Sequence, residues 1–340
     1  VLLLAGLGAR WASRLLGFSA AAAATAAVLY QVTPYVLPYV SRTSVMLLPF
    51  AGLGWIVGLT VLATRRSGWG APAGIALVVL TVGAVNATAL AMIVPGPLLW
   101  LLHSTWAGNT SVRRALTVAG QTAVLSLGVS LWWVAMLAVQ ARHGVDVIAF
   151  SEALEDVALT STAPEVLRSL GYWLFYVRDS FGPATSESLG YLTSSRFILL
   201  SYAVPVAGAF GLVAVRWAHR RFAVWLVGAG ILLGVGVHPT DDPAPLMDLL
   251  TGGGEAGLAE ALRSSSRALP LVALGLGLGA ASVVEALPRA GRVRNVPWDG
   301  VRHAAAGGLA LLAVVNRPAL WTGGFTDPVL EREQDPPDSW

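Results

Sequence analysis

The stretch SVMLLPFAGLGWIVGLTVLA, residues 44–63, contains no charged side chain, and Arg65 and Arg66 follow it almost at once. An α-helix of about 20 mainly apolar residues is long enough to cross the hydrocarbon core of a lipid bilayer. Similar stretches recur along the 340-residue chain, in which 55% of the residues are hydrophobic and 12% are charged. Soluble domains carry about 25% charged residues. The sequence therefore predicts an all-α, polytopic membrane protein.

We expect about nine or ten transmembrane or half-spanning helices, which form one membrane domain over residues 1–316. Surface helices are expected on the extracytoplasmic side. The expected spans are residues 1–9, 16–32, 44–63, 71–92, 95–107, 116–141, 196–215, 222–237, 268–287 and 301–316.

The arginines indicate the orientation of the chain, because cytoplasmic loops of membrane proteins accumulate basic residues. If the expected spans alternate, five arginine clusters fall on one side, which is then the cytoplasmic side of the plasma membrane. This alternation requires the short segment 95–107 to cross the bilayer. The clusters are Arg10 and Arg14; Arg65 and Arg66; Arg113 and Arg114; Arg216, Arg220 and Arg221; and Arg289, Arg292 and Arg294.

The acidic residues are segregated to the opposite side. All of the 19 acids except Glu285 and Asp299 lie in residues 144–195, 238–266 and 317–340. Acidic residues contribute little to membrane insertion. Their segregation therefore points to the function of the outer face, where we expect the chemistry of the protein.

Composition also excludes some functional classes. The chain has no cysteine, which excludes disulfides, thiolate catalysis and cysteine-ligated metals. The pI of 9.6 does not indicate nucleic-acid binding, because the arginines form short clusters and no continuous basic face. The chain starts at Val1 without a signal peptide and ends in the polar tail EREQDPPDSW. We therefore expect a fragment in which residues 317–340 lead into further extracytoplasmic domains.

Two helices that lie on the membrane surface are expected within the outer segment 144–195. Apolar residues from Phe150 to Ala158 repeat at helical spacing. Thr162 and Glu165 then match a capping box, which predicts a second helix to about Tyr176. Such a pair of helices suits a substrate with a lipid tail and a polar head.

The acids Glu152, Glu155 and Asp156 are candidates for the acceptor side of a site, where a carboxylate takes a proton from an acceptor hydroxyl. The alternative is that they form the hydrated face of the first helix. Tyr172 and Trp173 are candidates for stacking on a sugar ring, and anchoring at the membrane interface is the alternative.

Three arginines on the outer side, Arg42, Arg263 and Arg267, are candidates for binding a phosphate group. Outer arginines run against the positive-inside trend, and a guanidinium group presents forked donors that match phosphate oxygens. The alternatives are contact with lipid headgroups for Arg42, and ion pairs with Glu260 or Asp242 for the other two.

Asp241 and Asp242 are candidates for binding a divalent metal together with His238, because hard cations prefer carboxylate oxygens. A solvated loop is the alternative, and no other cofactor is expected. Asn86 and His103 are the polar residues deepest within the expected spans. We expect both to hydrogen-bond between helices, with a contact to substrate as the alternative.

Several short motifs, spread over nearly the whole chain, carry a resemblance to a known family. The motifs are TPYVLPYVSRTSVMLLPF (33–50), VNATAL (85–90), APEVLRSLGYWLFY (163–176), SRALPL (266–271), RPALWTGGFTDP (317–328) and DPP (335–337). Together with the many spans and the outer surface helices, they resemble the multi-span glycosyltransferases of the C type (GT-C). The chain is most similar to the actinobacterial α-(1→3)-arabinofuranosyltransferases among them.

The resemblance implies transfer of arabinofuranose from a decaprenyl-phosphate donor to the arabinan of arabinogalactan or lipoarabinomannan, outside the cytoplasm. It implies donor-phosphate contacts for Arg42 and Arg267, an acceptor side at residues 152–156, and a catalytic aspartate in the first outer loop. No acid precedes Asp146, so we expect this chain alone to be inactive.

Two other functions remain open from the sequence. A transporter or flippase of lipid-linked saccharides would be expected to show internal repeats and ionisable residues along a midplane pathway. A transferase of another polyprenyl-phosphate sugar, such as mannose, differs from the first interpretation only in family likeness.

Overall fold

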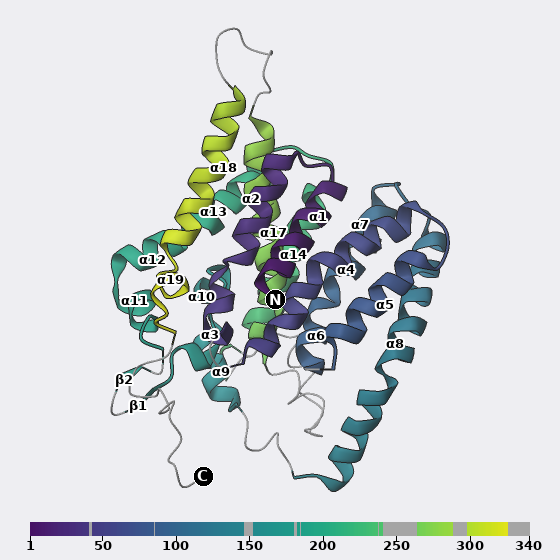
Figure 1. Ribbon diagram of the computed structural model, residues 1–340, viewed down its shortest axis with the longest axis horizontal. Helices are drawn as coiled ribbons and strands as arrows, with labels where there is room; N and C mark the ends of the chain where they lie inside the picture. The colour runs from purple at the N-terminus through teal and green to yellow at the C-terminus, as the bar shows by residue number, and fades with distance from the viewer. Residues whose placement is uncertain are drawn as a thin grey trace, which may run out of the picture.

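The computed structural model describes residues 1–40, 43–84, 86–145, 152–179, 182–183, 185–236, 238–240, 264–287 and 298–325. These residues form a bundle of α-helices (Figure 1). The predicted fold class, an all-α polytopic membrane protein, is confirmed. In the described part of the chain, the only strands are the two-residue β1 (Arg178–Asp179) and β2 (Gly182–Pro183).

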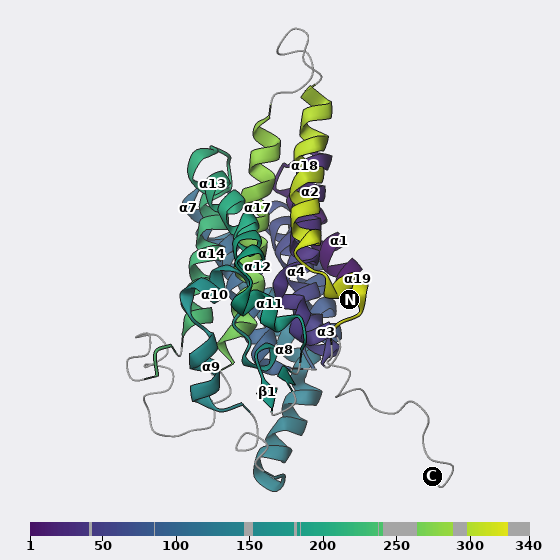
Figure 2. The same ribbon diagram turned by 90° about the vertical axis from the view of Figure 1, so that its left-hand side faces the viewer.

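The centre of the bundle is α17 (Leu269–Ala286), whose side chains are almost all buried. It packs against α2 (Ala20–Gln31), α13 (Ala203–Ala214) and α14 (Arg220–Val235). Figures 1 and 2 show α17 surrounded by these helices. A short 3₁₀ turn, η4 (Ser265–Ala268), leads into it. Residues just before residue 269 are thereby fixed at one end of the core.

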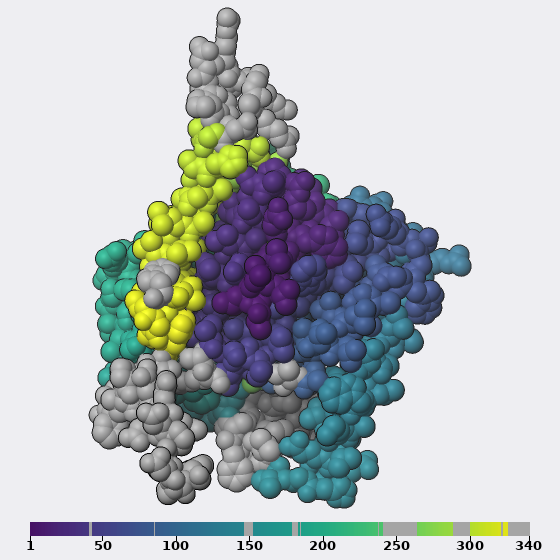
Figure 3. Space-filling model, in the orientation of Figure 1, coloured from purple at the N-terminus to yellow at the C-terminus, as the bar shows by residue number. Residues whose placement is uncertain are grey.

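The N-terminal helices form one face of the bundle (Figure 3). α1 (Leu2–Leu15) packs against α2 and α4 (Leu47–Arg65), and α18 (Trp298–Val315) lies beside α2. The chain leaves α2 at Gln31 because Pro34 has no N–H group to continue the helix. The turns η1 (Pro34–Val36), α3 (Leu37–Val40) and η2 (Ser44–Met46) then connect α2 to α4.

One expected span is wrong in its bounds. Residues 71–92 do not form a single helix, because α5 (Gly70–Val82) ends and the Asn86 side chain caps the start of α6 (Ala87–Ile93). The Asn86 carboxamide oxygen accepts from the backbone N–H of Ala89 at 2.7 Å. The Asn86 side chain thus acts as the N-cap of α6.

The same break changes the next crossing. α6 and α7 (Pro95–Trp106) together give an apolar helical segment of 20 residues, from Ala87 to Trp106, which is long enough to span a membrane by length and composition. The segment 95–107, on which the predicted orientation depends, is thus the second half of a longer crossing.

Six helical segments of the described residues are long and apolar enough to cross a membrane, and two shorter apolar helices accompany them. The longest is α8 (Val112–His143), with 32 residues, most of which are exposed at the edge of the bundle. Its C-terminal end projects beyond the neighbouring helices (Figures 1 and 2). The protein is therefore a multi-pass membrane protein.

The short helices of residues 154–201, where surface helices were predicted, lie together at one end of the bundle (Figure 1). The second of them is shorter than predicted, because α10 ends at Leu167 and not near Tyr176. Ser169 and Gly171 adopt positive φ angles of 57° and 103°, which turn the chain out of the helix. The elements are α9 (Leu154–Thr160), α10 (Ala163–Leu167), η3 (Trp173–Phe175), α11 (Ser188–Thr193) and α12 (Ser195–Ser201).

The predicted capping box does not form, since the Thr162 side chain makes no cap hydrogen bond. Glu165 instead pairs with Arg168, which lies one turn later. The last described element, α19 (Ala319–Thr322), follows α18 at the same end of the bundle as α11.

Candidate functional site

Four side chains from three separate segments meet at the end of the core where α17 begins, and we name them the Glu152 cluster: Glu152, Trp173, Ser264 and Arg267. Arg267 Nη2 lies 3.0 Å from Glu152 Oε1, and Trp173 Nε1 donates to Glu152 Oε2 at 2.9 Å. The Ser264 hydroxyl also donates to Glu152 Oε1. The glutamate side chain is only 8% exposed, so this carboxylate is a buried charge held by three donors.

The segments of the cluster are distant in the sequence. Glu152 directly precedes α9, Trp173 opens η3, and Ser264 and Arg267 lie around η4 at the start of the central helix. The contact between Glu152 and Arg267 joins residues 115 positions apart. Two residues that the sequence assigned to opposite sides of a site, one to the acceptor and one to the donor phosphate, are therefore direct partners.

Polar groups in the cluster and directly beside it are left unused by the contacts of Glu152. Arg267 Nε and the Ser265 hydroxyl are buried, and neither has a hydrogen-bond partner among the described residues. Buried polar groups are normally paired, because an unpaired group loses its hydration without compensation. The cluster thus has more hydrogen-bond donors than the Glu152 carboxylate occupies.

Aromatic side chains form a wall beside the cluster. The rings of Tyr39 and Tyr172 stack with centroids 4.7 Å apart, and Tyr172 meets Trp173 edge to face. Tyr172 is buried, so one of its faces is covered by Tyr39. This packing links α3 to η3 and fixes the direction of the Trp173 indole N–H.

The other predicted site residues lie apart from the cluster or outside the described residues. Glu155 and Asp156 are exposed in the first turn of α9, where the helix dipole favours negative charge. The residues outside the described ranges are Arg42, Arg263, Asp241 and Asp242.

His238 is the one residue of the predicted metal site that lies within the described ranges, and it makes a hydrogen bond to α9. Its Nδ1 lies 2.8 Å from the carbonyl oxygen of Ala158, so it donates to α9. Within the described ranges, no group of three or more histidine, aspartate or glutamate residues is placed to hold a metal ion.

A second polar network was not predicted from the sequence. Arg168 donates to the Ser201 hydroxyl at 2.6 Å and to the Tyr191 carbonyl at 2.9 Å, and it forms an ion pair with Glu165. The Tyr176 hydroxyl donates to Glu165 as well. Burial, followed by the charge of Glu165, raises the pKa of Tyr176.

Arg317 completes this network from the end of α18. Arg317 Nε donates to the Val32 carbonyl at 3.1 Å and Nη1 to the Asn316 carbonyl at 2.6 Å. These carbonyls follow the C-termini of α2 and α18, where the helix dipoles favour a cation. Burial lowers the pKa of Arg317. Arg317 thus joins the C-terminal ends of α2 and α18.

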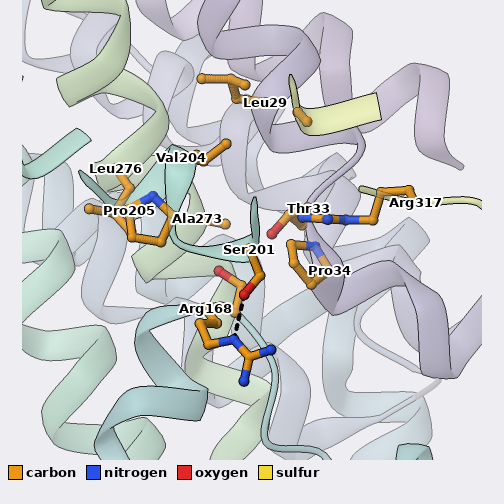
Figure 4. A pocket seen from close by; sticks show the side chains of 12 residues that line it. Leu29, Thr33, Pro34, Arg168, Ser201, Val204, Pro205, Ala273, Leu276 and Arg317 are labelled. Carbon is orange, nitrogen blue, oxygen red and sulfur yellow. Dashed lines mark hydrogen bonds between the residues drawn. The ribbon is translucent and has the colours of Figure 1, made fainter. Parts of the chain in front are cut away.

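A small cavity lies between Arg168 and Arg317 (Figure 4). Arg317 reaches Thr33 and Pro34 from one side, and Arg168 is bonded to Ser201 on another. The cavity volume of about 20 Å³ is enough for roughly one water molecule. This network is too tightly filled to bind a sugar or a lipid headgroup. Arg168 and Arg317, like Arg267, are arginines in segments that the sequence assigns to the extracytoplasmic side, and this is the signal that could have identified them.

A larger and almost entirely apolar cavity, of about 510 Å³, lies between α8 and the helices α4 to α7. Ala87, Leu90 and Ala91 of α6 line it, and α6 also packs against η4, which carries Arg267. On the α8 side, the buried polar groups of Thr122, Ser126 and Trp133 have no hydrogen-bond partner among the described residues.

The predicted interhelical contact of His103 is confirmed. His103 Nε2 lies 3.2 Å from Nδ1 of His219, which directly precedes α14. Trp100 packs against both imidazole rings. This contact holds α7 to α14 at the end of the bundle opposite the Glu152 cluster.

Comparison with known proteins identifies two kinds of similarity. The family model described as "Alpha-(1->3)-arabinofuranosyltransferase, N-terminal GT-C domain" matches residues 1–333. Two cryo-EM structures of arabinofuranosyltransferase AftD from Mycobacteria, one of them a mutant, superpose with TM-scores of 0.61 and 0.62. They are 20% and 21% identical to this chain and cover 96% of it. No curated protein matches.

The chain spans about a fifth of the length of these solved structures, 20% and 21% respectively. At this identity, the superposition shows a shared fold and not a shared activity.

Proposed function

Because this chain belongs to the family of N-terminal GT-C domains of α-(1→3)-arabinofuranosyltransferases, we propose that it forms the membrane part of an enzyme that transfers arabinofuranose. The donor is a decaprenyl-phosphate arabinose, and the acceptor is the arabinan of arabinogalactan or lipoarabinomannan. The reaction takes place on the extracytoplasmic side of the plasma membrane. The observation that carries this proposal is the family match over residues 1–333.

We assign Arg267 to the donor phosphate. It lies at the outer end of the bundle, is 11% exposed, and keeps a buried Nε donor without a described partner. The Ser265 hydroxyl, two residues earlier, is also buried and also lacks a described hydrogen-bond partner. Guanidinium and hydroxyl donors are the groups that bind phosphate oxygens in proteins. Arg42 and Arg263 are proposed for the same phosphate on the sequence alone.

The transfer breaks the bond between the anomeric carbon and the phosphate oxygen and forms a bond from that carbon to an acceptor oxygen. A carboxylate base takes the proton of the acceptor hydroxyl, and cations stabilise the departing lipid phosphate. Arg267 is the cation that stabilises the departing lipid phosphate. Glu155 and Asp156, which are exposed on α9, are proposed for the acceptor side.

Donor binding by the full-length protein in lipid nanodiscs tests this assignment. Arg267→Ala is expected to weaken the affinity for decaprenyl-phosphate arabinose about 10- to 100-fold, which is the effect of losing a hydrogen bond to a charged group. Arg113→Ala is the matched control, because Arg113 is exposed at the start of α8, on the predicted cytoplasmic side. Equal affinity of wild type and Arg267→Ala would remove the proposed phosphate site.

A further inference from the structure

We propose that the Glu152 carboxylate occupies the position on Arg267 that the phosphodiester of the donor takes when it binds. Glu152 then competes with the donor for Arg267 and lowers the donor affinity. The inference rests on the proposed function, because it takes the donor phosphate to bind at Arg267.

The Glu152 cluster has the composition of an anion receptor. A guanidinium, a hydroxyl and an indole N–H converge on one carboxylate from three segments of the chain, and all three are donors. A carboxylate accepts through two oxygen atoms, and the three converging donors match the oxygens of another bound anion equally well.

The charge and the oxygen count of the two anions agree. A carboxylate has one negative charge shared between two oxygens. The phosphodiester of a lipid-linked sugar likewise has one negative charge shared between two non-bridging oxygens. Exchange of one for the other leaves the net charge around Arg267 unchanged, whereas adding the phosphate beside Glu152 would place two negative charges together.

The receptor is larger than the carboxylate that fills it. Glu152 accepts from Nη2 of Arg267 and leaves Nε, which lies on the same edge of the guanidinium as Nη2, without a described partner. The hydroxyl of Ser265, in the adjacent turn, is buried and has no hydrogen-bond partner in the part of the chain that the structure describes. A phosphodiester also has ester oxygens and is attached to a sugar, so it can accept hydrogen bonds from Arg267 Nε and the Ser265 hydroxyl, which the carboxylate does not use.

The attachment of Glu152 allows this exchange without unfolding a helix. Glu152 lies before the N-terminus of α9, and the next residue, Ala153, has an extended backbone with ψ of 146°. α9 itself is held by Val157 and Ala158, which are buried against Trp173. Rotation of the Glu152 side chain therefore breaks its three hydrogen bonds and leaves the packing of α9 in place.

Measurement of donor affinity separates a competing anion from a catalytic base. Glu152→Gln keeps the size and the acceptor oxygen of the side chain but removes its charge. It is expected to bind decaprenyl-phosphate arabinose about tenfold more tightly than wild type, in full-length protein in nanodiscs. An acceptor-side base predicts the reverse pattern: slower turnover with unchanged donor affinity, and this result would overturn the inference.

The control is Glu187→Gln, which makes the same change of charge at a carboxylate near α11 that has no contact with the cluster, and its donor affinity should equal that of wild type. If Arg267→Ala weakens donor binding while Glu152→Gln does not strengthen it, the inference fails and the proposed function stands. If Arg267→Ala has no effect, the proposed phosphate site fails as well.

A second measurement covers the case in which Glu152→Gln folds poorly. Diethyl phosphate, a minimal phosphodiester, should raise the thermal unfolding midpoint of Glu152→Asp more than that of wild type, because the shorter side chain keeps its charge but reaches Arg267 less well. An equal shift in the two proteins would contradict the competition.

Discussion

At the scale of single residues, buried charges are the most informative features of this protein. Arg302 Nη2 lies 3.3 Å from Glu285 Oε2 and donates to the Ser19 hydroxyl at 3.0 Å. The backbone N–H of Ser19 donates to Glu285 at 2.8 Å. These contacts join α18, α17 and the start of α2. They also explain why Glu285 departs from the outer segregation of the acids, since it has a structural partner.

Arg302→Ala is expected to lower the free energy of unfolding by about 3 kcal/mol, because it leaves the Glu285 carboxylate without its charged partner in a largely buried place. Thermal unfolding in detergent measures the loss. The double variant Arg302→Ala/Glu285→Ala should lose clearly less than the sum of the two single variants. Strict additivity would show that the pair is not coupled.

The contact between His103 and His219 predicts a pH dependence of stability. Burial, with the nearby charges of His103 and Arg65, lowers the pKa of His219 to about 4, from an ordinary value of about 6.5. Between these values the unfolded chain binds a proton that the folded chain does not. The stabilisation is therefore complete above about pH 6.5 and is lost as the pH falls through about 4.

The free energy of unfolding should accordingly fall between pH 7 and pH 4.5, by about 1 kcal/mol after allowing for the partial exposure of the ring, and the thermal unfolding midpoint should fall with it. In His219→Gln, the same pH change should produce a smaller fall. Identical pH profiles of the two proteins would assign the effect to other groups.

The sequence singled out Arg267, Glu152, Tyr172 and Trp173 but gave no means of pairing them. Hydropathy and periodicity give information about single helices, whereas the contact between Glu152 and Arg267 joins residues that are 115 positions apart in the sequence. The partners expected for Arg267, Glu260 and Asp242, lie outside the described residues. Arg168 and Arg317 carried the same outer-arginine signal and were overlooked.

At the scale of the elements, close packing of α13 against α17 depends on glycines. A Cβ atom at Gly211 would lie 1.8 Å from the carbonyl oxygen of Gly279, and one at Gly279 would lie 2.4 Å from that of Gly208. Such backbone contact is the usual way in which membrane helices associate tightly.

Gly211→Ala is expected to push α13 away from α17 and to lower the free energy of unfolding by about 2 kcal/mol or more. Gly228→Ala is the matched control, since a Cβ at that position in α14 meets no atom within 4 Å. The unfolding midpoints in detergent should fall for the first variant and not for the second. A midpoint of Gly211→Ala equal to that of the control would mean that the two helices move apart at little cost.

Most helices could be predicted from apolar runs, but their breaks could not be predicted from average hydropathy. Asn86 ends one helix and caps the next within an apolar run, because its short side chain bonds to a backbone N–H. The segment 162–176 shows periodicity, yet the backbone at Ser169 and Gly171 turns it out of the helix. In both places the local backbone conformation ends the helix, and the periodicity of the apolar residues gives no sign of that conformation.

At the scale of the whole molecule, the orientation in the membrane decides which site can meet an extracytoplasmic acceptor. Residues 87–106 are long and apolar enough to provide the crossing on which the predicted alternation depends. The Glu152 cluster and the short helices α9 to α11 lie at one end of the bundle, and the contact of His103 with His219 lies at the other.

The absence of cysteine makes this orientation directly testable. A membrane-impermeant maleimide should label Glu155→Cys in intact cells and should label Ser67→Cys only after the membrane is opened, because both positions are exposed and are predicted to face opposite sides. The reverse pattern would place the Glu152 cluster in the cytoplasm and exclude the proposed extracytoplasmic reaction.

The cavity beside α8 has a pharmacological consequence. Its walls are almost entirely apolar and belong mainly to helices long and apolar enough to cross a membrane, so the small molecules that suit it also dissolve in lipid. Transfer of such a molecule from lipid to an apolar cavity gains little from the hydrophobic effect. Selectivity among inhibitors would then come from shape and from hydrogen bonds to Thr122, Ser126 and Trp133.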